Sequence, residues 1–77
     1  MTVIKAVVGA MPTDLKALTS ARRHVAEGRL IVSRQKLRIA RLKAAGCFTL
    51  DAEQTLDVFE RSLRIFEEHE QKLSREI

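Results

Sequence analysis

Residues 14–45 read DLKALTSARRHVAEGRLIVSRQKLRIARLKAA, and side chains that are small or apolar, apart from one glutamine, recur along this segment at alternating steps of three and four. Steps of this kind place side chains on one face of an α-helix, as in a coiled coil. Such a helix is about 50 Å long and needs a partner to cover that face. We call this row the first seam, and it consists of Leu18, Ala21, Val25, Gly28, Val32, Gln35, Ile39 and Leu42.

A second seam follows after residue 50, again at steps of three and four. Between the two seams, Lys43 and Gly46 are typical of a helix end, and Thr49 or Asp51 is typical of a helix start. Gln54 stands three residues after Asp51, which is the spacing of a capping box. The second seam consists of Ala52, Leu56, Phe59, Leu63, Phe66, Glu70, Leu73 and Ile77.

The two seams predict an all-α fold, an antiparallel two-helix hairpin that resembles a coiled coil. We expect helices over 13–45 and 50–76, a turn over 46–49 and a hairpin domain over 13–77. Residues 1–12 are rich in Val and contain Gly9 and Pro12, so we expect a flexible or extended N-terminal arm there. The predicted helix–helix core consists of Leu18, Val25, Gly28, Val32, Ile39, Leu42, Leu56, Phe59, Leu63, Phe66 and Leu73.

The register of the hairpin also follows from the seams. Setting Ile39 level with Leu56 places Gly28 opposite Phe66, where the glycine leaves room for the ring. Gln35 then lies opposite Phe59, either as a buried polar group that fixes the register or at the edge with its amide in water. The same register aligns three ion pairs on one flank, Lys43–Glu53, Lys36–Glu60 and Arg29–Glu67.

The opposite flank has apolar residues that a single hairpin leaves uncovered. Apolar side chains repeated at a spacing of seven indicate a further helix, and we expect a homodimer that forms a four-helix bundle. We call this flank the candidate oligomer face, and it consists of His24, Ile31, Val58, Ile65 and His69.

The two histidines of this face have three readings. A zinc site needs three or four ligands, and the sequence has no motif that supplies them, so no metal ligand is predicted. Partly buried, hydrogen-bonded histidines are the simpler interpretation. In a third interpretation, protonation below about pH 6 adds like charges at the dimer face.

Positive charge is concentrated in the first predicted helix. Between Arg22 and Lys43 there are eight Lys or Arg residues and one acid, Glu27. Arg34, Arg38 and Arg41 form an outer ridge, which is either a solvated face or a track for phosphates. The acidic second half weakens the field of this ridge. Three Phe and no Trp or Tyr leave little scope for base stacking, so nucleic acid is the less favoured partner.

The chain has few groups suited to catalysis. Cys47 is the only cysteine and lies about 30 Å or more along the helices from either histidine, so no catalytic residue, cofactor or enzymatic activity is predicted. The single thiol suits a reducing compartment, and no apolar run reaches the length of a membrane span, so we expect a cytoplasmic protein that does not bind membranes. The predicted role is that of a small helical interaction or regulatory protein.

The pattern of these residues resembles a group of short uncharacterised bacterial proteins over residues 22–75. The shared features are a His-apolar-Ala-x-Gly segment at residues 24–28, a Gln, a Gly-turn-Thr and a second helix with spaced Leu and Phe. The resemblance implies a helical hairpin that is not a fragment of an enzyme, and it carries no assigned activity. It is based on the segment HVAEG and on Gln35, Gly46, Leu56, Phe59, Leu63 and Leu73.

Overall fold

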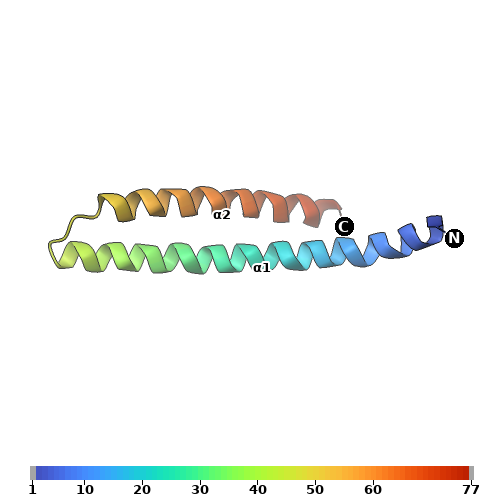
Figure 1. Ribbon diagram of the computed structural model, residues 1–77, viewed down its shortest axis with the longest axis horizontal. Coiled ribbons are helices and arrows are strands. Elements are labelled where there is room, and N and C mark those ends of the chain that lie inside the picture. The colour runs from blue at the N-terminus through green and yellow to red at the C-terminus, as the bar shows by residue number, and fades with distance from the viewer. Residues whose placement is uncertain (1, 77) are drawn as a thin grey trace.

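The computed structural model describes the backbone of residues 2–76 and the side chains of residues 15–76. It contains two helices, α1 (Thr2–Ala44) and α2 (Leu50–Glu76), and no strand within the described backbone. The helices lie side by side and run in opposite directions, in a molecule with extents of 66 × 19 × 14 Å (Figure 1). The predicted all-α fold and the two-helix hairpin are confirmed.

The start of α1 differs from the sequence expectation. The structure does not show an extended arm over residues 1–12, because α1 is already helical from Thr2, and its first turns run past the end of α2 (Figure 1). Pro12 therefore lies inside a helix rather than before one. A proline removes one backbone hydrogen bond and costs about 3 kcal/mol in a helix interior, and α1 nevertheless continues through Pro12.

α1 ends one residue before the predicted boundary, in a Schellman motif at Gly46. The Cys47 N–H donates to the Leu42 carbonyl at 2.9 Å, and the Gly46 N–H donates to the Lys43 carbonyl at 3.0 Å. Gly46 has a φ of 74°, a left-handed conformation that residues with a Cβ adopt only with strain. The short segment Ala45–Thr49 then reverses the chain, and α2 begins at Leu50 as predicted.

Thr49 precedes the first residue of α2 and occupies the position of its N-cap. The Glu53 N–H donates to the Thr49 carbonyl at 2.8 Å. Asp51 is the second residue of the helix rather than its cap, so the predicted capping box with Gln54 is not formed at that position. Asp51 and Glu53 instead place negative charge in the first turn, where the helix dipole favours it.

The buried side chains all lie on α1. Among residues 15–76, five hydrophobic side chains are buried, and α2 contributes none of them. The second-seam residues from Ala52 to Leu73 are at most half-buried, and Phe66 is 38% exposed, whereas Ile77 lies outside the described residues. Most of the first seam is thus covered by α2, whereas the second seam is only partly covered. The buried residues are Leu18, Ala21, Val25, Val32 and Ile39.

Ion pairs join the two helices along one flank. Arg29 pairs with Glu67 at 3.1 Å and Lys43 with Glu53 at 3.2 Å, as the register predicts. The third predicted pair, Lys36–Glu60, is not among the ion pairs of residues 15–76.

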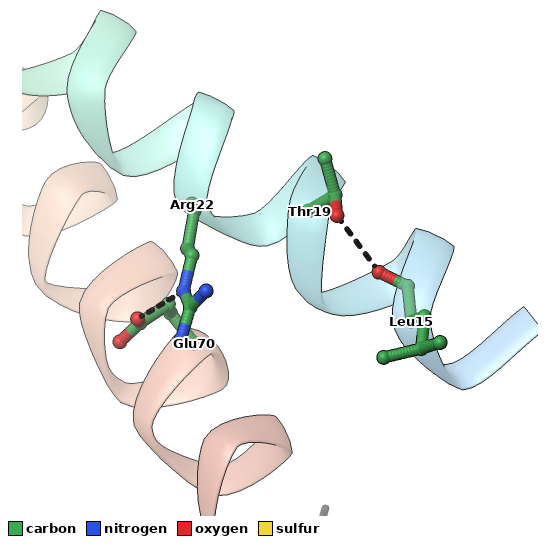
Figure 2. Close-up of polar contacts among 4 residues, drawn as sticks. All are labelled: Leu15, Thr19, Arg22 and Glu70. Atoms are coloured by element: carbon green, nitrogen blue, oxygen red, sulfur yellow. Dashed lines mark hydrogen bonds and ion pairs between the residues drawn. The ribbon is translucent and has the colours of Figure 1, made fainter.

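A further ion pair explains the acid in the second seam. Arg22 reaches across from α1 to Glu70 on α2, with its Nε 3.5 Å from the carboxylate Oε1 (Figure 2). The Glu70 side chain is only 25% exposed, so the arginine neutralises a charge that is held near the helix interface. About one helical turn before Arg22, the Thr19 hydroxyl donates to the carbonyl of Leu15 in its own helix at 2.9 Å (Figure 2).

Gly28 faces Leu63 rather than Phe66. A Cβ built on Gly28 would lie 3.1 Å from Leu63 Cδ1, so the leucine side chain occupies the space left by the glycine. The Phe66 ring lies beside the imidazole of His24, with ring centroids 5.5 Å apart and planes tilted by 36°. In a coiled coil, each side chain packs between residues of the facing helix rather than directly opposite one of them. Gly28 therefore contacts Leu63, the seam residue next to the Phe66 that the level pairing predicts.

Candidate interaction face

The candidate oligomer face is exposed in the hairpin. Ile31 is 45% exposed, Val58 57% and Ile65 65%, although each is large and apolar. Phe66 borders them from the second seam. An exposed apolar row of this kind is typical of a surface that binds another helix.

His24 and His69 are both exposed side chains on their helices. His24 packs on the Phe66 ring, so one of the two is held against the edge of the face. Within the side chains of residues 15–76, no group of three or more His, Cys, Asp and Glu residues is arranged to hold a metal ion. The effect of these two histidines on association stays a prediction.

The arginine ridge also lies in solvent. Arg34, Arg38 and Arg41 are exposed, and the ion pairs of residues 15–76 include none of them. Their spacing of four and then three places them along one side of α1 over about 10 Å. The ridge therefore offers three guanidinium groups that no carboxylate of the described side chains neutralises.

A hollow near the turn is a feature that the sequence does not indicate. Phe48 is fully exposed there, and Leu50 is 63% exposed. No periodic pattern covers the residues of a turn, so only the structure shows that the Phe48 ring lies outside the core. The hollow measures about 460 Å³ and is lined by Gln35, Arg38, Leu42, Phe48, Asp51, Ala52, Thr55 and Phe59.

The opposite flank has a different character. A smaller hollow of about 230 Å³ there is bordered by Arg22, Arg29, Glu67 and Glu70, whose charges are already paired across the helices. The two flanks thus divide the hairpin into a polar, paired side and a side with uncovered apolar residues.

Comparison of the chain with protein families, with curated proteins and with solved structures finds no match. The resemblance of residues 22–75 to short bacterial hairpin proteins therefore stays a prediction. Neither helix, over the residues that the structure describes, is long and apolar enough to cross a membrane.

Proposed function

We propose that the chain is a small, non-catalytic interaction protein that self-associates through the candidate oligomer face. Two hairpins then form a four-helix bundle and present the remaining surfaces to other molecules. A module of this kind suits a role in regulation or assembly better than a role in catalysis.

The observation that carries this proposal is the uneven burial of the two helices. α2 buries no residue, while Val58 and Ile65 project from it with more than half of their area exposed. Fully burying a side chain of this size is worth about 1.5–3 kcal/mol, so covering this face of α2 favours association. A hairpin of this length has too little core of its own to make that contribution unimportant.

Analytical ultracentrifugation of the full chain tests the proposal. We expect a dimer in the micromolar range and a monomer for Ile65→Asp, since the substitution places a charge at the centre of the face. Leu37→Asp is the matched control, because Leu37 is 50% exposed but lies on the side of α1 that points away from α2. A monomeric native chain, or equal dissociation by both variants, contradicts the proposal.

A second candidate function is the binding of nucleic acid along the arginine ridge. It is favoured by one observation, the absence of Arg34, Arg38 and Arg41 from the ion pairs of residues 15–76. Binding to a labelled single-stranded oligonucleotide is then expected to weaken steeply with salt, with a slope of about −0.7 for each phosphate contacted. Replacing the three arginines by glutamine abolishes such binding, whereas Arg61→Gln, which removes an arginine paired with Asp57, leaves it unchanged.

A further inference from the structure

We propose that a second copy of the chain packs along α2 in the opposite direction, about a two-fold axis that passes beside Ser62. This inference rests on the self-association proposed above and specifies its geometry. Its basis is two neighbouring rows of α2 residues, each with a spacing of seven, which keeps a row on one side of a helix. The outer row consists of Asp51, Val58, Ile65 and Lys72, and the inner row of Thr55, Ser62 and His69.

The outer row is complementary to its own reverse. An antiparallel copy brings Asp51 against Lys72 of the copy and Val58 against Ile65 of the copy. Each row end then meets an opposite charge, and the apolar side chains meet in the middle. A parallel copy instead brings like charges together at both ends, Asp51 on Asp51 and Lys72 on Lys72, which disfavours it.

The midpoint of the inner row is Ser62, and it nearly coincides with the midpoint of the outer row, which lies between Arg61 and Ser62. Reversal places Thr55 against His69 of the copy and Ser62 against Ser62. The centre of the outer row lies half a residue away, which is about 0.75 Å along a helix. Serine is small, so it lets two helices approach closely at the axis. One symmetry axis therefore satisfies both rows.

The side chains of the outer row are available for these contacts. Asp51 and Lys72 are exposed, and neither takes part in an ion pair among residues 15–76. Val58 and Ile65 are among the most exposed apolar residues of α2. Arg61 lies near the axis at the rim, but its charge is paired with Asp57 at 2.9 Å, so two copies of it do not meet as unpaired cations.

The seam aromatics beside the inner row fit the same axis. Phe66 is 38% exposed and Phe59 is half-buried. Reversal about Ser62 brings Phe59 of one copy toward Phe66 of the other. The two-fold arrangement thus covers the part of the second seam that α1 leaves open.

Charge reversal tests the pairing of Asp51 with Lys72. Asp51→Lys and Lys72→Asp are each expected to weaken the dimer by about tenfold, because each creates two like-charge contacts per dimer. The double variant D51K/K72D restores the opposite charges and is expected to return to within about twofold of the native dissociation constant. Any loss of helix stability caused by D51K alone persists in the double variant, so restoration reports on the contact between copies.

Distances between identical sites test the direction of packing. Nitroxide labels are attached at cysteines introduced at Arg61, Gln54 or Glu68, which are exposed and border the proposed contact, in a Cys47→Ser background that removes the exposed native thiol. An antiparallel dimer gives the shortest separation at position 61 and an additional axial separation of roughly 20 Å at positions 54 and 68. Circular dichroism confirms that each labelled chain keeps its helicity.

The outcomes separate this geometry from self-association itself. A dimer with equally short separations at all three positions, or a double variant as weak as the single ones, overturns the antiparallel register but leaves self-association in place. A native chain that is monomeric at all concentrations overturns both.

Discussion

The side-chain amide of Gln35 donates a hydrogen bond of 2.8 Å from its Nε2 to the backbone carbonyl of Ala52. Gln35 is half-buried on α1 and Ala52 lies in the first turn of α2, so the bond joins the two helices next to the turn. Of the two sequence interpretations of this glutamine, the structure agrees with a partly buried polar group that contacts the facing helix.

We predict that Gln35→Ala lowers the free energy of unfolding by about 1 kcal/mol, because the bond and the packing of the side-chain stem are both lost. Thermal unfolding followed by circular dichroism at one protein concentration measures the effect. Gln54→Ala is the control, since Gln54 is exposed on α2, and its stability is expected to stay near that of the native chain. Equal losses in the two variants would show that the Gln35 bond has no special contribution.

Gly28→Ala is predicted to stabilise the hairpin by up to about 1 kcal/mol, the difference in helix propensity between the two residues. The new Cβ would lie 3.1 Å from Leu63 Cδ1, which is the flexible end of a half-buried side chain and moves aside easily. Gly28→Phe cannot be accommodated in this way and is expected to destabilise the hairpin. Urea denaturation of the three chains gives the order, and a less stable alanine variant would show that Leu63 is held rigidly.

Gly46→Ala is predicted to destabilise the hairpin. No side chain or backbone atom lies within 4 Å of a Cβ built at Gly46, so space is not limiting, but the φ of 74° strains any residue with a Cβ. A loss of about 1 kcal/mol in the free energy of unfolding is expected. Gly46→Asn, which tolerates this conformation better, should lose less, and the same denaturation experiment compares the two.

Glu70→Leu is predicted to raise the free energy of unfolding by about 1 kcal/mol. The substitution completes the second seam with an apolar side chain at a position where the glutamate is only 25% exposed. It also removes the ion pair with Arg22, whose guanidinium is largely in solvent and whose contribution is therefore a few tenths of a kcal/mol. A destabilised variant would show that the Arg22–Glu70 pair contributes more than its exposure indicates.

The hairpin could be predicted because it depends on local signals. The seams set which face of each helix is apolar, and Gly46 marks the helix end through a backbone requirement that few other residues meet. The pairing of individual residues across the two helices is harder to predict from the sequence. Periodicity shows which face of a helix is apolar, but it does not give the rotation of one helix against the other. For this reason the sequence pairs Gly28 with Phe66, whereas Leu63 fills that space and Phe66 lies against His24.

Two other differences have separate causes. Gly9 and Pro12 usually indicate a break in a helix, so the sequence predicts an arm over residues 1–12, where the structure has helix from Thr2. Phe48 belongs to the turn, where no period predicts whether a ring is buried, and it is fully exposed. The exposure of Val58 and Ile65 follows from a repeat and could be predicted from the sequence, whereas the exposure of Phe48 depends on a single side chain and could not. The role of Val58 and Ile65 in association stays a prediction.

The short connection at Gly46 is also expected to set the order in which the hairpin forms. Contacts between the helices join residues close in the chain at Lys43–Glu53 and far apart at Arg22–Glu70. The entropy cost of closing a loop rises with its length, so pairing is expected to begin beside Gly46 and to proceed toward the open end like a zipper. The open end then frays first, and backbone amides near Glu70 should exchange their hydrogens with solvent faster than those near Leu56.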